Sequence, residues 1–168
     1  MAWRRWLGTV ELLALGLWVG ALAFWGGIGA PTAFRVLERE AAGAYVRAVF
    51  PRYYTVGLVL GALAFGTGVA GRILRKDQRL LSWATLLMVL MMILATSFAR
   101  TYVLPRMEEL RVVQQQAAPG SAEYQEAKAY FEGSHRASVA LNAITLVTGL
   151  VAFLLIPVSR SERTHPGG

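Results

Sequence analysis

Residues 131–157 read FEGSHRASVALNAITLVTGLVAFLLIP, and the apolar run in this stretch is about as long as a helix that crosses a bilayer. Its polar and small residues share one helix face, because they recur at spacings of three, four, three and four: His135, Ser138, Asn142, Thr145 and Gly149. Unpaired polar groups are costly in hydrocarbon, so we expect this stripe to face protein. The other apolar segments of the chain are therefore expected to cover it.

The composition places the chain among integral membrane proteins. Of its 168 residues, 55% are hydrophobic and 16% are charged, whereas soluble domains average about 25% charged residues. The net charge of +7 would suggest a nucleic-acid partner in a soluble protein. Here the basic residues flank apolar runs, so we expect the lipid bilayer and no nucleic acid as their partner. The chain has no cysteine, which excludes disulfides, thiolate metal sites and a cysteine nucleophile.

Four apolar runs predict an all-α integral membrane four-helix bundle. The spans are predicted at residues 7–29, 52–74, 80–103 and 136–157. Together they form one membrane domain over residues 1–158, followed by a polar tail over residues 159–168. The first run is interpreted as a retained span, because it is longer than a signal-peptide core of about 7–15 residues.

Two amphipathic helices are predicted at the membrane interface. Pro31 is expected to break the first helix, after which residues 33–50 place apolar side chains at helical spacing. Pro51 suits the first turn of the second span. Between the third and fourth spans, Ser121 is expected to cap a further amphipathic helix that leads into the fourth span. Both helices are expected on the side opposite the chain termini.

Small residues follow one face of the second span, and we interpret this face as a helix-packing surface: Gly57, Gly61, Ala64, Gly68 and Gly71. The close approach that glycines allow brings backbone carbonyls within reach of polar side chains on other helices. We therefore expect Asn142 to form a hydrogen bond across the bundle, near Trp18 or a glycine-exposed carbonyl.

The distribution of basic residues predicts the orientation. Four spans put both termini and the short middle loop on one side of the membrane. Most of the charged residues on that side are basic: Arg4, Arg5, Arg72, Arg75, Lys76, Arg79, Arg160 and Arg163. Basic residues in short flanks dominate membrane topology. We therefore place both termini in the cytoplasm and the protein in the cell's inner membrane.

Several short motifs occur in order along the chain: Trp18-x-Gly20 with Phe24, Ala30-Pro31-x-x-Phe34, Phe50-Pro51-x-Tyr53, Leu104-Pro105-Arg106, and Phe131-x-x-x-His135-x-x-Ser138-x-x-x-Asn142. Together they resemble the family of small four-span proteins typified by transmembrane protein 205, whose domain has no assigned biochemical activity. That family's association with platinum-drug export implies handling of metals or small molecules. The layout is also similar to copper-resistance protein D and to a haem-binding protoporphyrinogen oxidase family, although architecture does not determine function.

Cofactor binding would depend on very few residues. His135 is the only histidine in or near a span, and it could be structural or could serve proton, metal or haem chemistry. A bis-histidine haem site within one chain is excluded, while ligation across a dimer or with a methionine stays open. Met88, Met91 and Met92 could bind Cu(I), but core packing is the favoured interpretation. We therefore expect no cofactor, with haem and copper as alternatives.

Charged residues near the ends of the spans suggest two further features. Glu11 lies about one turn inside the first span, and Arg72 ends the second span at similar depth, so we expect a structural ion pair. At the opposite face, Arg100, Arg136 and His135 are expected to form a binding mouth together with Glu132. Interfacial snorkelling of the arginines is the alternative interpretation. Trp25 and Tyr102 are expected to anchor the chain at this interface.

No catalytic constellation is present in the sequence, so enzymatic activity is not expected. The favoured hypothesis is transport or export of a small molecule or metal species, using the polar stripe and the mouth. The alternatives are a haem- or metal-dependent redox protein centred on His135, and a structural subunit that packs as a homo-oligomer or within a larger membrane complex.

Overall fold

The computed structural model of the protein describes residues 2–161, and every regular element within them is helical, which confirms the all-α fold. The elements are α1 (Ala2–Phe24), η1 (Trp25–Gly29), α2 (Ala30–Val36), α3 (Arg39–Arg75), α4 (Leu80–Phe98), η2 (Ala99–Val103), α5 (Leu104–Gln116) and α6 (Ala122–Ser161). Four continuous helical stretches are long and apolar enough to cross a membrane: Arg5–Val36, Arg39–Arg75, Leu80–Gln116 and Ala122–Val158. The protein is therefore a multi-pass membrane protein.

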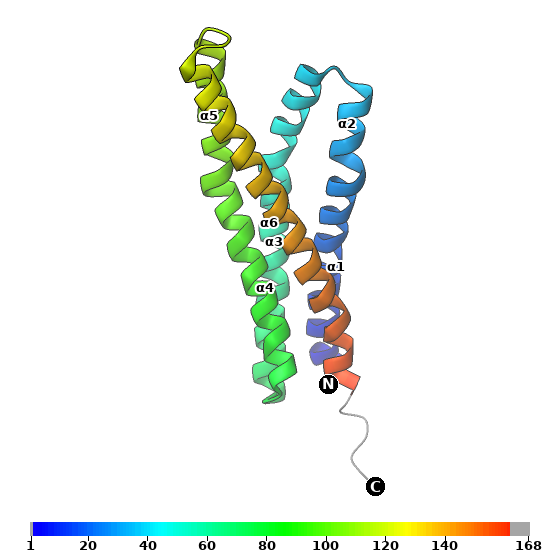
Figure 1. The fold of residues 1–168 in the computed structure, drawn as a ribbon. Helices are drawn as coiled ribbons and strands as arrows, with labels where there is room; N and C mark the ends of the chain where they lie inside the picture. The colour runs from blue at the N-terminus through cyan, green and yellow to red at the C-terminus, as the bar shows by residue number, and fades with distance from the viewer. Residues whose placement is uncertain (1, 162–168) are drawn as a thin grey trace.

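The four long helices form an antiparallel bundle (Figure 1). The helix α1 packs against α3 and α6, and α4 packs against the same two helices, so that the four close a ring around one core. The described chain begins and ends at the same end of this bundle, as the four-span prediction requires (Figure 1).

The first and third long helices each contain a π-helical segment followed by a proline. Pro31 follows η1 and Pro105 follows η2, and in both places the helix continues. The prediction that Pro31 breaks the helix is therefore wrong. A proline lacks the N–H that the carbonyl four residues earlier would accept, and the wider π-turn just before each proline accommodates this mismatch within a continuous helix.

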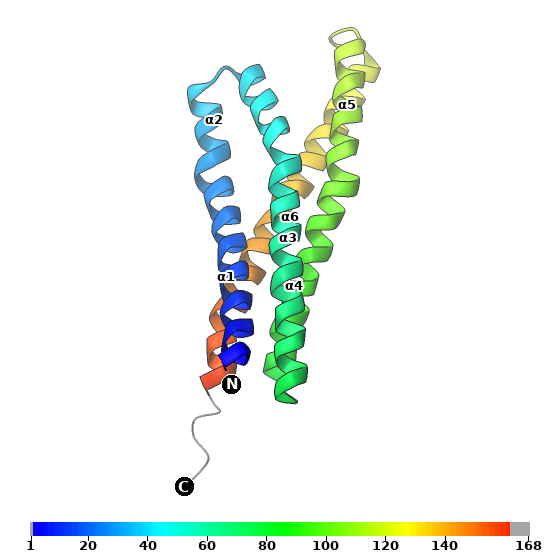
Figure 2. The ribbon, with the colours of Figure 1, turned by 180° about the vertical axis from the view of Figure 1, so that it is seen from behind.

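The amphipathic segments are helical but do not form separate helices. The α3 helix runs without interruption from Arg39 through Pro51, and α6 begins at Ala122, well before its apolar part. Ser121 caps α6 as predicted, because its Oγ accepts a hydrogen bond from the Tyr124 backbone N–H at 3.2 Å. The chain thus extends beyond the spans as two helical hairpins, α2 with α3 and α5 with α6, whose tips stand apart (Figures 1 and 2).

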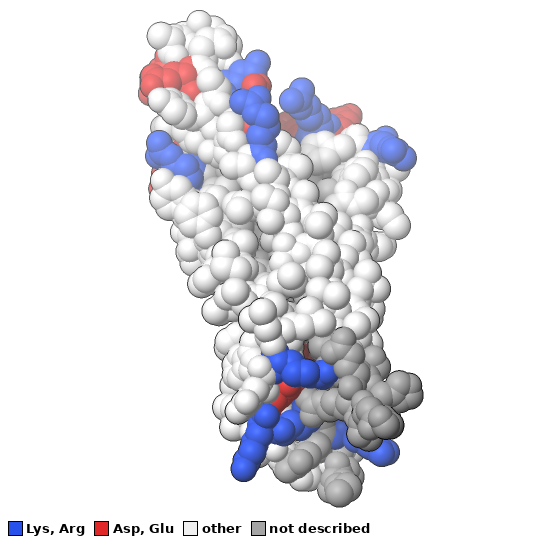
Figure 3. Space-filling model, turned by 60° about the horizontal axis from the view of Figure 1, so that its bottom comes forward, with Lys and Arg blue, Asp and Glu red and all other residues white. Residues whose placement is uncertain are grey.

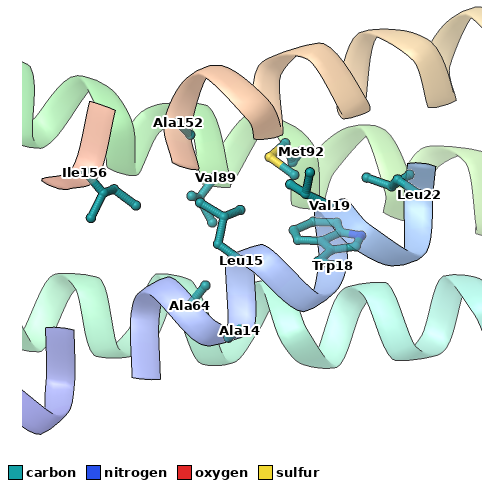
Figure 4. Close-up of a cluster of buried hydrophobic side chains, with 10 residues drawn as sticks. All are labelled: Ala14, Leu15, Trp18, Val19, Leu22, Ala64, Val89, Met92, Ala152 and Ile156. Carbon is teal, nitrogen blue, oxygen red and sulfur yellow. The ribbon is translucent and has the colours of Figure 1, made fainter. Parts of the chain in front are cut away.

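Trp18 fills the centre of the bundle, where the small residues of α3 leave room for it. A Cβ atom on Gly57 would lie 2.6 Å from the indole Nε1, and one on Gly61 would lie 2.6 Å from Cζ3. Leu15, Val89 and Met92 pack in the same cluster of buried side chains (Figure 4). The glycine stripe is therefore a packing surface, as predicted.

Charged side chains gather at the two ends of the molecule and leave an uncharged band between them (Figure 3). Arg75, Lys76 and Arg79 lie in and beside the short connection between α3 and α4, at the end where the chain begins. Arg163 and most of the predicted polar tail lie outside the described residues 2–161. The uncharged band matches a hydrocarbon core.

Candidate functional site

A large cavity opens between the two helical hairpins. Its volume is about 1790 Å³, and its walls come from α1 with η1 and α2 on one side and from α5 and α6 on the other, with α3 contributing throughout. Figure 1 shows the upper parts of α2 and α6 separated, with α3 behind them. The cavity exists because the bundle closes around Trp18 while the hairpin tips diverge.

A hydrogen-bonded cluster forms the floor of the cavity. Asn142 Nδ2 donates to the Tyr54 hydroxyl at 3.2 Å, and the Tyr53 hydroxyl donates to Asn142 Oδ1 at 3.4 Å. The hydroxyls of Tyr54 and Ser138 lie 3.5 Å apart. Asn142 thus bonds across the bundle as predicted, but its partners are two tyrosines rather than a group near Trp18 or a glycine carbonyl.

Local sequence explains why these side chains meet. Ser138 and Asn142 are four residues apart on α6 and share one face, and Asn142 Nδ2 also donates to the Ser138 carbonyl at 2.9 Å. Ser138, Thr145 and Gly149 are buried, so the stripe does face protein. His135, at its outer end, is exposed and lines the cavity.

Aromatic side chains make one wall of the cavity. The ring of Trp25 lies 6.1 Å from that of Tyr45, 5.9 Å from that of Phe50 and 6.2 Å from that of Tyr53, between ring centroids. Trp25 is 9% exposed, so the prediction that it anchors at the lipid interface is wrong. Its Nε1 is buried and has no hydrogen-bond partner among the described residues. The indole N–H of Trp25 is therefore a buried donor without a partner in this aromatic wall.

The predicted mouth is only partly assembled. His135, Arg136 and Glu132 line the cavity, whereas Arg100 does not and is exposed. Trp18, the remaining residue of the predicted site, packs in the core below the cavity. Ala99, the residue before Arg100, takes the position that faces the cavity, which leaves Arg100 on the exposed side of the helix.

The Glu11–Arg72 ion pair is confirmed, at the opposite end of the bundle. Arg72 Nη1 lies 2.8 Å from Glu11 Oε1, and the side chains are 2% and 1% exposed. The same guanidinium donates to the Gly68 carbonyl, the Ser82 carbonyl and Thr85 Oγ1 at 2.8–2.9 Å. Buried charges persist when they are paired and fully hydrogen-bonded, so this cluster has a structural role.

The methionines do not converge on one point. Met92 is 1% exposed within the core, while Met91 is 55% exposed on the outer surface of α4. Within the described part of the chain, no three histidine, aspartate or glutamate side chains gather as metal ligands would. Core packing is therefore the role that Met92 has in the fold.

The sequence did not point to Tyr53, Tyr54, Arg47 or Arg111 as residues of the cavity. The run Phe50-Pro51-Arg52-Tyr53-Tyr54 places three aromatic residues at a span boundary, where aromatic residues are also common at the lipid interface, so the sequence did not distinguish these two positions. Arg47 and Arg111 have no distinguishing local sequence pattern, since their inward position depends on how the two hairpins diverge.

Comparison with known proteins gives the family of the chain. Residues 13–116 match the model of a domain of unknown function, DUF4149. An uncharacterised protein of Aquifex aeolicus (strain VF5) is 39% identical over 59 residues, which cover 35% of this chain and 45% of that protein. No solved structure matches the chain. The matched residues include more than half of the chain, so the protein belongs to the DUF4149 family.

Proposed function

We propose that the protein binds a small amphipathic organic molecule in the cavity between its hairpins and takes part in the transport or export of that molecule. The observation that carries this proposal is the cavity itself, with apolar and aromatic walls above a hydrogen-bonded floor. Ligand sites typically combine a mostly apolar lining with a few placed polar groups that orient the ligand. The tyrosine and asparagine cluster supplies such groups.

The size and position of the cavity favour a membrane-soluble ligand. Its volume of about 1790 Å³ exceeds the roughly 300–1,000 Å³ of most small-molecule pockets. Exposed apolar residues of α1 and α6, such as Ala23, Val139 and Ala143, belong to its lining. A ligand dissolved in the bilayer would therefore reach the cavity between α1 and α6.

Passage to the other face would require a conformational change. Below the floor, Trp18 and its neighbours pack as the core of the bundle. Transport by this protein therefore needs the two hairpins to rotate or separate, as helices do in hinge and shear motions. The sequence resemblance to the transmembrane protein 205 family, which is associated with drug export, is consistent with this transport hypothesis.

The orientation that we propose places both termini in the cytoplasm and the cavity toward the opposite side of the inner membrane. The support is the basic connection between α3 and α4, where Arg75, Lys76 and Arg79 are close to the bilayer surface.

Cysteine labelling tests the cavity directly, because the chain has no native cysteine. Ala143 lines the cavity, whereas Ala140, on the same helix, is exposed but lies outside it. In vesicles, a water-soluble maleimide should modify Ala143→Cys faster than Ala140→Cys. The methyl ester of 11-(dansylamino)undecanoate, an uncharged amphiphile, should slow only the first reaction. Equal rates at both positions, without protection by the ester, would exclude this binding site.

A redox role is the second candidate, and one observation favours it. His135 on α6 and Met107 on α5 line the same cavity, and histidine with methionine is one of the ligand pairs that bind haem. When bound, haem would supply one-electron chemistry, and these two residues would hold it. Expression with added haem should then give a Soret band that His135→Ala removes. A colourless protein under those conditions would eliminate this candidate.

A further inference from the structure

Two arginines from opposite hairpins converge at Gly43. The Nη1 atoms of Arg47 and Arg111 lie 3.6 Å and 3.8 Å from the position that a Cβ atom on Gly43 would occupy. Arg47 belongs to α3 and Arg111 to α5, so each hairpin contributes one guanidinium. Both side chains are half-buried and line the cavity. The absence of a side chain on Gly43 leaves the space between them open.

Neither guanidinium forms an ion pair within the described residues 2–161. The ion pairs in this part of the chain involve other arginines, although Glu40, Glu108 and Glu132 line the same cavity. Arg111 lies over the face of Phe131, 5.3 Å from the ring centroid, which holds its side chain in place. Two like charges that approach one point repel, and an anion bound at that point would reduce the repulsion.

We propose that Arg47 and Arg111 bind the oxyanion group of an anionic amphiphile, a carboxylate or phosphate, whose apolar part lies against the aromatic wall of the cavity. Guanidinium groups suit these oxyanions because their planar N–H donors match two oxygens at once. Charge-assisted N–H···O bonds are about 2.8 Å long. One oxyanion near Gly43 could therefore accept such bonds from both guanidinium groups. This proposal rests on the proposed function, because it assumes that the cavity is a ligand site.

The depth of the arginines agrees with a membrane lipid or fatty acid as the source. Arg47 precedes the apolar part of α3 by about one and a half turns, and a helix rises about 1.5 Å per residue. Its guanidinium therefore lies near the level of lipid headgroups. Trp25, Phe50 and Tyr53 lie on the side of Arg47 that leads into the bilayer, where an acyl chain would extend.

Binding of 11-(dansylamino)undecanoate and of its methyl ester tests this proposal. The protein is held in a neutral maltoside detergent, which removes competing phosphate headgroups, and probe fluorescence reports Kd. Arg47→Gln and Arg111→Gln should each weaken binding of the carboxylate about 10- to 100-fold. Neither change should alter binding of the ester. Arg52→Gln and Arg106→Gln are matched controls, because both arginines are exposed on the same two helices and lie outside the cavity.

Further variants separate an effect on binding from an effect on folding. Arg47→Lys keeps the charge but loses the planar donors, so it should restore only part of the affinity. Thermal unfolding identifies any variant whose loss of binding reflects loss of structure. Competition by oleoyl lysophosphatidate but not by inorganic phosphate would identify a lipid source. Competition by inorganic phosphate alone would identify a free anion.

The failures of the two proposals are distinguishable. If the carboxylate and the ester bind equally well, and neither Arg47→Gln nor Arg111→Gln weakens the carboxylate, the arginine site is wrong while the cavity remains a binding site. If neither probe binds the wild-type protein, the proposed function is wrong as well.

Discussion

At the scale of single residues, the two polar clusters of this protein have different roles. Glu11 and Arg72 are almost completely buried and pair with each other, and three neutral oxygens accept further hydrogen bonds from the guanidinium. In the cluster around Asn142, Tyr53 and Asn142 are part-buried, and the cluster lines the cavity. The first is closed to any ligand, whereas the second is accessible to one.

We predict a large energetic coupling between Glu11 and Arg72. Glu11→Ala leaves an unpaired guanidinium in the bundle, and removing one partner of a buried pair costs about 3–5 kcal/mol. The double change with Arg72→Ala removes both charges, so its effect on the free energy of unfolding should be smaller than the sum by about 0.5–3 kcal/mol. Unfolding in mixed micelles, followed by circular dichroism, measures all three variants. Additive effects would contradict a direct pair.

The hydroxyl of Tyr54 should contribute modestly to stability. Tyr54→Phe removes the hydroxyl that contacts both Ser138 and Asn142. Interhelical hydrogen bonds in membranes average about 0.6 kcal/mol, so the thermal midpoint should fall only slightly. Tyr45→Phe is the control, because Tyr45 is exposed and its hydroxyl forms no hydrogen bond among the described residues. A fall in dansyl-ester affinity for Tyr54→Phe alone would assign the floor to ligand binding; equal affinity would make it structural.

At the scale of elements, glycine and proline positions shape the bundle. The glycines of α3 bring its backbone against the indole of Trp18, which fixes the distance between α1 and α3. The π-helical segments before Pro31 and Pro105 let two long helices continue past a proline. Together these features allow tight packing at one end of the molecule and diverging hairpins at the other.

Gly61→Ala should destabilise the bundle, whereas Gly66→Ala should not. A Cβ atom on Gly61 would lie 2.6 Å from Trp18 Cζ3 and 2.9 Å from Ile93 Cγ1, so the indole must move. Overpacking of this kind costs about 1–3 kcal/mol. Gly66 has no atom within 4 Å of its Cβ position, and alanine there should gain up to about 1 kcal/mol of helix propensity. Thermal unfolding of the two variants compares them, and equal midpoints would mean that Trp18 does not pack on α3 in this way.

At the scale of the whole molecule, the bundle has two different ends. One carries both ends of the described chain, the buried ion pair and a short basic connection; the other carries the hairpins and the cavity (Figures 1 and 3). Because the two ends differ, a ligand can enter the molecule at the end with the cavity. Passage of that ligand to the other end would require the helices to rearrange.

Labelling from one side of the membrane should distinguish the two ends. Gln78 lies in the connection between α3 and α4, and Ala122 begins α6 at the other end; both are exposed. In intact cells, an impermeant maleimide should modify Ala122→Cys and should modify Gln78→Cys only after the membrane is permeabilised. The reverse pattern would invert the proposed orientation, and labelling of both positions from one side would reject the four-span arrangement.

The sequence by itself determined the membrane class, the four spans and the direction of the polar stripe. The length of an apolar run and its helical periodicity are local properties of the sequence. In lipid, a spanning segment must form its backbone hydrogen bonds within a helix, and a polar side chain such as Asn142 must face protein to find a hydrogen-bond partner. The Glu11–Arg72 pair was predictable for the same reason, because two charges at one depth have few alternatives. The divergence of the hairpins, the burial of Trp25 and the approach of Arg47 and Arg111 to Gly43 are visible only in the folded bundle. These positions depend on the angles at which the helices cross and on the helices continuing through Pro31, Pro51 and Pro105. Both result from many small contacts between distant residues, so no short stretch of sequence shows them.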